Sequence, residues 1–214
     1  MAYQGRILAG VAVPDTEIVR EALRYSRSIY EPYLLNHVVR SWLFAISLAS
    51  IQNIEHDSEV IALGTLLHDV TLNNSFRGPR RFEVEGADIA RSFALSAGIS
   101  SSRAQLIWDS VALNSTPSIG LYKEPEVALC TAGICLDVVG FQYDRMPVAT
   151  RKAITDAYPR LGMKAKMTNC FCHMVEAAPE TSYDNFLRDF GRRYVGGYAE
   201  PSSVDLVMNA PFES

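Results

Sequence analysis

The chain alternates long apolar segments with short polar breaks, and the apolar residues in these segments recur at helical spacing. From Ile18 to Ile29 they return every three or four residues. From Leu34 to Ile51 nearly every face is apolar, which is typical of a central buried helix. The same patterning predicts further helices over 58–70, 82–97, 100–115, 125–139, 147–158, 163–177 and 183–194. We therefore predict an all-α fold, a single-domain helical bundle of about eight or nine helices.

Strands are not expected, because no segment combines strand-like alternation with tight-turn residues over the length that a sheet needs. The helical domain is predicted to span residues 14–195, after an N-terminal extension over 1–13. Residues 196–214 form a tail rich in glycine, proline and serine. Its one apolar piece, Val204 to Met208, is expected to dock on the body or on a neighbouring chain, so a homo-oligomer is one expectation.

Composition narrows the classes of partner. The chain has 214 residues, 48% of them hydrophobic and 21% charged, which is an ordinary globular balance for one domain. A formal net charge of -4 provides no basic surface for nucleic acid. The apolar stretch 7–13 is too short to span a bilayer and lacks a basic flank, and four cysteines do not make a disulfide framework. We expect a cytoplasmic protein with no membrane partner.

Candidate chemistry begins at His68-Asp69, which directly follows the apolar run 60–67. Neighbouring side chains leave a helix about 100° apart, so these two can converge only on something just off its surface, such as a metal ion. The chain contains its own control, His56-Asp57, which lies in a polar break between two apolar runs. There we predict that Asp57 or Ser58 caps the next helix.

Two other segments predicted to form buried helices contain polar residues among their apolar ones. His37 and Arg40 interrupt the apolar segment 34–51, and His37 is either a core histidine with a hydrogen-bond partner or part of a site. Asp137 is the single acidic residue of its apolar run, and burying it is costly unless a metal or an arginine offsets the charge. Taken together, two imidazoles and two carboxylates from separated helices can enclose one divalent transition ion.

A loop predicted after the His-Asp pair, residues 71–82, carries Asn73, Arg77, Arg80 and Arg81. Loops held by a rigid frame often supply binding groups, so this loop is a natural lip for a pocket. Its basic residues are either contacts for an anionic or polar substrate or a solvated surface.

The order His, then His-Asp, then Asp on buried helices resembles the HD-domain superfamily of metal-dependent hydrolases. More narrowly, six blocks between residue 14 and about residue 140 resemble the cyanamide hydratase branch of that superfamily. The six blocks are Pro14-Asp15-Thr16, Leu35-Asn36-His37-Val38-Val39-Arg40-Ser41, Leu66-Leu67-His68-Asp69-Val70, Arg81-Phe82-Glu83-Val84-Glu85-Gly86-Ala87-Asp88, Trp108-Asp109-Ser110-Val111-Ala112-Leu113 and Leu136-Asp137-Val138-Val139-Gly140.

This resemblance implies an enzyme that hydrates a small nitrile-like substrate, cyanamide to urea, by metal-activated water. The metal ligands would be His37, His68, Asp69 and Asp137. Zinc is the metal expected in this branch, whereas iron and manganese also serve in the superfamily. Asp69 and His68 would take part in catalysis. The expected substrate contacts are Asn114, Asn73, Arg77, Glu83 and Arg40.

Two departures from the branch bear on the substrate. Asn114-Ser115 stands where the branch usually has a histidine followed by threonine, and Asn114 cannot titrate. Thr71 stands where a glycine usually follows the His-Asp pair. Two alternatives therefore stay open. One is an HD-type phosphohydrolase of a nucleotide or phosphate ester, with Arg77, Arg80 or Arg81 on the phosphate, and the other is a catalytically altered HD-fold protein that binds without turning over.

Overall fold

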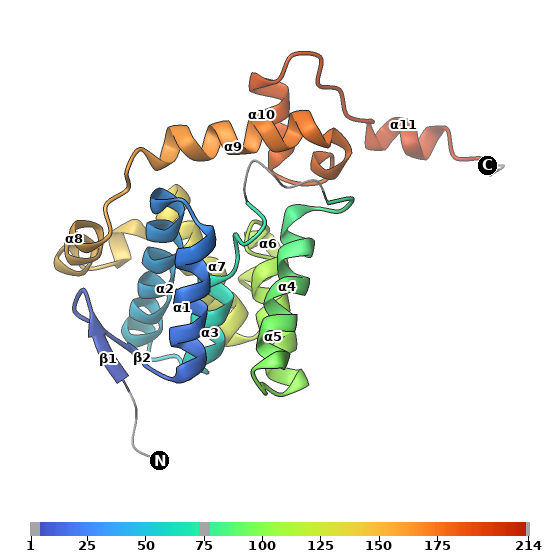
Figure 1. The fold of residues 1–214 in the computed structure, drawn as a ribbon. Coiled ribbons are helices and arrows are strands. Elements are labelled where there is room, and N and C mark those ends of the chain that lie inside the picture. Colours follow the sequence, from blue (N-terminus) through green and yellow to red (C-terminus); the bar gives the residue numbers. More distant parts are fainter. Residues whose placement is uncertain (1–4, 73–77, 213–214) are drawn as a thin grey trace.

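The computed structural model describes residues 5–72 and 78–212, and helices dominate this part of the chain (Figure 1). The all-α prediction is confirmed. The described residues form eleven α-helices, two more than the upper predicted number, because the short α6 and α11 were not foreseen. The helices are α1 (Glu17–Ile29), α2 (Pro32–Gln52), α3 (Ser58–Leu66), α4 (Phe82–Ser96), α5 (Ser101–Ala112), α6 (Pro117–Gly120), α7 (Pro125–Val139), α8 (Val148–Ala157), α9 (Met163–Ala177), α10 (Leu187–Tyr194) and α11 (Ser203–Met208).

A two-stranded antiparallel hairpin precedes the helices and was not predicted. Strand β1 (Gly5–Leu8) pairs with β2 (Val11–Pro14), with Leu8 opposite Val11. Ala9 and Gly10 make the turn with φ of 47° and 82°, as a two-residue hairpin loop with positive φ at both positions requires. In β2 the side chains of Val11 and Val13 are buried in the helical core while Ala12 is exposed. Four alternating residues are too short a pattern to reveal a strand in the sequence.

Helix α2 forms the centre of the molecule, as its sequence predicted. It packs against α7, α3 and β2, and most of its residues from Tyr33 to Ala49 are buried. By length and apolarity α2 resembles a membrane-spanning helix, yet 78% of its most apolar 18-residue window lies buried inside the protein. Its contact with α7 is close, because a Cβ at Gly133 would lie 2.4 Å from the Ser41 carbonyl oxygen. This close crossing brings polar groups of the two helices together.

Other helices pack against that centre and against one another. Helix α5 packs against α4, α3 and α7, while α9 crosses one end of the body and contacts α10 (Figure 1). Helix α11 lies away from the body, and the side chains of Val204, Leu206, Val207 and Met208 are 61–76% exposed. The apolar piece of the tail therefore does not dock on the body, and docking on a neighbouring chain stays a prediction.

Candidate metal centre

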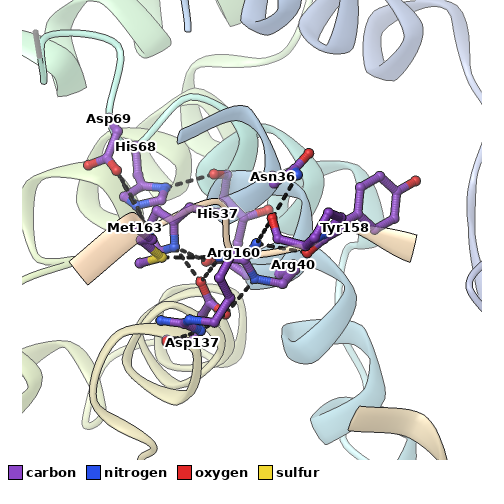
Figure 2. A network of polar contacts seen from close by, with 12 residues as sticks. Asn36, His37, Arg40, His68, Asp69, Asp137, Tyr158, Arg160 and Met163 are labelled. Atoms are coloured by element: carbon purple, nitrogen blue, oxygen red, sulfur yellow. Dashed lines mark hydrogen bonds and ion pairs between the residues drawn. The ribbon is translucent and has the colours of Figure 1, made fainter. Parts of the chain in front are cut away.

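Three side chains from two separate segments converge on one buried point (Figure 2). The Nε2 atoms of His37 and His68 are 3.1 Å apart, and the Asp69 Oδ2 atom lies 3.5 Å from the first and 3.2 Å from the second. A tetrahedral zinc ion with bonds of about 2.0 to 2.1 Å holds its ligand atoms about 3.3 to 3.4 Å apart. The three observed separations match that spacing, so the group can hold a transition-metal ion.

The other ring nitrogen of each histidine is already engaged. His37 Nδ1 lies 2.7 Å from Asp137 Oδ2, and His68 Nδ1 lies 2.7 Å from the Thr65 carbonyl oxygen. Because both partners only accept, each Nδ1 carries the proton and donates it. In the neutral rings this leaves the Nε2 lone pairs directed at the same point. Such fixing of the tautomer is how proteins orient histidine ligands.

Asp69 provides the strongest sign that a cation belongs at this point. Its side chain is 4% exposed, and its Oδ2 atom is buried with no hydrogen-bond partner among the described residues. The 3.2 Å approach of His68 Nε2 is thus an electrostatic contact without hydrogen-bond geometry. Two lone pairs and a buried anionic oxygen facing one another repel unless positive charge lies between them. A divalent ion satisfies all three atoms at once.

The pKa values follow from the same electrostatics. Burial lowers the pKa of His37, opposed by its hydrogen bond to Asp137, and so favours the neutral imidazole that a metal requires. Burial also acts to lower the pKa of His68, but the Asp69 charge raises it overall. Burial acts to raise the pKa of Asp69, and the adjacent imidazoles lower it. The point between these groups therefore attracts positive charge, whether carried by a proton or by a metal.

The turn that carries His68 and Asp69 is held by hydrogen bonds from α1 and by one within the turn itself. Helix α3 ends at Leu66, whose carbonyl oxygen accepts hydrogen bonds from the hydroxyls of Ser26 and Tyr30 in α1. The Leu72 amide then donates to the Asp69 carbonyl oxygen at 2.8 Å. These bonds satisfy the carbonyls at the buried end of α3 and fix the direction in which both side chains leave the turn. The helix was predicted to run over 58–70 and to include His68 and Asp69, but it ends at Leu66, and the pair lies in the turn that follows.

Asp137 does not join the three-residue group, which differs from the prediction that it is a fourth metal ligand. Its Oδ2 atom accepts from His37 Nδ1 and Arg40 Nη2, and its Oδ1 atom accepts from Arg40 Nε and Arg160 Nη1, all within 3.0 Å (Figure 2). A carboxylate offers about four lone-pair sites, so these four bonds occupy them all. Asp137 therefore lies behind His37 and orients its ring, with arginine rather than metal offsetting its charge.

Arg40 was predicted to contact substrate, but the structure places its guanidinium group on Asp137, and the substrate contact stays a prediction. Its side chain is fully buried and holds both oxygens of Asp137. Its Nη1 atom also donates to the carbonyl oxygen of Tyr158 at 2.9 Å. The pKa of Asp137 is held far below its usual range, because the hydrogen bonds from His37 and Arg40 outweigh the effect of burial. Arg40 thus stabilises the outer side of the site.

A cavity of about 200 Å³ adjoins the three-residue group. Its polar lining consists of His37, His68, Asp69, Asn114 and Ser115. The rest of its wall is apolar and comprises Phe82, Pro117, Ile134, Cys135, Val138, Val139, Met167, Phe171 and Phe186. We refer to this space as the site cavity. No lysine or arginine of the described residues lines it.

The other predicted substrate contacts divide into three cases. Asn114 lines the site cavity, and its Nδ2 group donates to the Val111 carbonyl oxygen at 2.7 Å, which fixes the amide. Glu83 is fully buried outside the cavity lining, where it accepts hydrogen bonds from Arg81 and from the Ser115 hydroxyl. Glu83 thus positions the Ser115 hydroxyl, and its own contact with substrate stays a prediction. Asn73 and Arg77 lie outside the described residues.

Sequence reasoning missed much of the cavity wall. Met167 and Phe171 belong to α9 and Phe186 precedes α10, far along the chain from the resembling blocks. These residues sit in ordinary apolar patterns, so no local signal could have marked them. Thr71, noted as a departure from the branch, donates its hydroxyl to the Phe82 carbonyl oxygen at 2.7 Å. It thereby ties the turn that follows Asp69 to the start of α4.

The other His-Asp pair, His56-Asp57, was predicted to contribute a helix cap, and this is confirmed. Asp57 caps α3, and its Oδ1 atom accepts from the amides of Glu59 and Val60. His56 Nε2 contacts the Ser58 hydroxyl at 3.1 Å. Of the two His-Asp pairs, only the second belongs to a metal-competent group among the described residues.

Comparisons with known proteins do not assign the chain. No protein-family model matches it, and no curated protein matches it significantly.

Proposed function

We propose that this protein is a metal-dependent enzyme of the cyanamide hydratase type within the HD-domain superfamily, adding water to a small nitrile-like substrate. The observation that carries the proposal is the convergence of His37, His68 and Asp69 on one point beside the site cavity. Two nitrogens and one oxygen are a donor set that suits zinc, and three protein ligands leave positions open for water and substrate. The resemblance of the six sequence blocks supports the same reaction class.

When bound, a divalent ion at this point would supply Lewis acidity and lower the pKa of water. Metal binding and proton transfer would then fall to different side chains of the protein. His68 Nδ1 donates to the Thr65 carbonyl oxygen, and its Nε2 atom faces the point where a metal would bind. Because neither nitrogen is left to take up a proton, we assign this ring to metal binding rather than to proton transfer. Asp69 has a second carboxylate oxygen, so we assign to it the uptake of a proton from water and its return to the nitrile nitrogen.

The rival reading, a phosphohydrolase, has less support from the cavity. A phosphate ester carries negative charge and is ordinarily held by arginine or lysine. Among the described residues none of these lines the site cavity, Arg80 is paired with Glu85 and Asp88, and Arg81 is paired with Glu83. A lining without a basic side chain among the described residues, and with the Asp69 carboxylate, disfavours an anionic substrate and favours an uncharged one.

The third reading, an HD-type fold that has lost catalysis, rests on Asn114. An amide does not ionise near neutral pH, so a step that needs a titrating group at that position would be lost. Gain of activity in Asn114→His over an inactive parent would support this reading.

The test combines metal content with turnover. Purified protein should carry close to one transition-metal ion per chain by elemental analysis and should form urea from cyanamide. Asp69→Asn should lose both, whereas Asp205→Asn, on the exposed helix α11, should lose neither. Release of phosphate from a nucleotide panel without urea formation would replace the proposal with the phosphohydrolase, and metal-free wild-type protein would end it.

A further inference from the structure

The site cavity is much larger and more apolar than cyanamide requires. Cyanamide has three non-hydrogen atoms and is polar at both ends, yet the cavity holds about 200 Å³ and its wall is formed mainly by apolar side chains. An engineered apolar cavity of about 150 Å³ is already large enough to bind benzene. The space beside the metal-competent group can therefore hold a body of the size of one aromatic ring.

Three phenylalanines give one wall a defined shape. The Phe186 ring meets Phe171 edge to face at 5.1 Å between centroids and meets Phe82 edge to face at 6.3 Å. Edge-to-face contacts at these distances are favourable arrangements of aromatic rings. Phe82 and Phe171 are 2% and 6% exposed, so the wall is packed before any ligand binds. It presents a preformed apolar surface rather than one that must rearrange.

Polar groups beyond the three-residue group, in contrast, are few and uncharged. The Ser115 hydroxyl donates to Glu83 and the Nδ2 group of Asn114 donates to Val111, which leaves the Asn114 amide oxygen without a hydrogen bond among the described residues. Beyond the three-residue group, a second polar end on the substrate would thus find only the Asn114 amide and the Ser115 oxygen, and no charged partner among the described lining residues. Burying a further polar or charged group against the apolar wall would be unfavourable.

We propose that the substrate is an uncharged organic nitrile whose reacting group faces His37, His68 and Asp69 and whose apolar body, up to the size of a phenyl ring, fills the rest of the site cavity. This rests on the proposed function and adds the substrate class to it. In the reaction the water oxygen bonds to the nitrile carbon, both C–N π bonds are replaced by a C=O bond, and both water protons end on nitrogen. The product is the amide.

The first experiment measures binding and turnover of a nitrile series by metal-loaded full-length protein. The probes are cyanamide, acetonitrile, isobutyronitrile, benzonitrile and the charged 4-cyanobenzoate. Each buried CH₂ group contributes about fourfold to affinity. A phenyl substituent has five more carbons than a methyl group, so full burial would tighten binding about 1,000-fold, and with the group partly buried in this open-sided cavity we expect about 100-fold. The charged analogue should bind more weakly than benzonitrile by at least tenfold.

The second experiment narrows the cavity. Val138 lines it and is 39% exposed, so Val138→Phe can fold while filling space at the wall. This variant should lose at least tenfold in benzonitrile affinity and keep its full metal content. The matched control is Val204→Phe on α11, which lies outside the cavity lining and should bind benzonitrile as the parent does.

The outcomes separate this inference from the proposed function. Tight benzonitrile binding with amide formation supports both, and tight binding without hydration supports the substrate class while rejecting the reaction. Urea formation from cyanamide, with no affinity for benzonitrile and none for isobutyronitrile, overturns the substrate class and keeps the reaction. Unchanged benzonitrile affinity in Val138→Phe overturns the placement of the apolar body.

Discussion

Replacing Arg40 by methionine would remove the buried charge that balances Asp137. The side chains of both residues are fully buried, and Arg40 donates to the two carboxylate oxygens at 2.7 and 2.8 Å. Methionine keeps an unbranched apolar stem but donates nothing. Asp137 would retain His37 and the half-exposed Arg160, so its charge would be partly rather than wholly compensated.

The size of the effect follows from this burial. Breaking a buried ion pair by removing one partner typically costs about 3 to 5 kcal/mol, because the remaining charge has no access to water. The surviving contact from Arg160 places the expected loss near the lower end, about 3 kcal/mol. For a domain of this length each kcal/mol shifts the melting temperature by about 2 to 4 °C. Arg40→Met should therefore melt roughly 6 to 12 °C below the parent.

Urea unfolding at pH 7 in the presence of a chelator measures this term without contributions from metal binding. The double variant Arg40→Met with Asp137→Leu should be less destabilised than the sum of the two single variants, because it leaves no charge stranded. A loss under about 1 kcal/mol in Arg40→Met, or simple additivity in the double variant, would refute the idea that arginine supports Asp137 behind His37.

Three further outcomes are expected. Asp69→Ala should lose the bound ion, seen by elemental analysis, and with it the rise in melting temperature that added Zn²⁺ produces in the parent, since an ion that binds only the folded state stabilises it. Gly133→Ala should lower the unfolding free energy by about 1 to 3 kcal/mol, because a Cβ there would meet the backbone of α2 at 2.4 Å, while Gly196→Ala, which meets nothing within 4 Å, should not. Burial acts to raise the pKa of Asp57, but hydrogen bonds from Arg103 and the α3 amides bring it below the ordinary value of 3.8. As the pH falls through and below 3.8, the unfolded state therefore binds more protons at this position than the folded state does. The free energy of unfolding of the parent should then fall more steeply with pH than that of Asp57→Asn, which cannot titrate but retains a capping side chain. Equal acid unfolding profiles of the two proteins would contradict this assignment.

The sequence by itself determined the helical class and the position of the central helix. The apolar residues on nearly every face of α2 can be buried only inside a core, whichever neighbours cover them. The sequence also separated the two His-Asp pairs, because a pair in a polar break caps a helix and a pair after an apolar run enters the core. Those inferences succeeded since they depend on local pattern and burial alone.

Only the tertiary structure decided which polar groups share the centre. His37 and Asp137 are 100 residues apart, and the sequence left open whether metal or arginine offsets the carboxylate. Folding placed Arg40 and Arg160 on Asp137 and saturated it, whereas it left the Asp69 oxygen unpaired beside two imidazoles. The apolar wall from α9 and the segment before α10 was likewise invisible in the sequence, because an apolar side chain looks the same whether it faces a core or a cavity. Which of these faces it meets depends on packing between distant helices, and no local pattern encodes that packing.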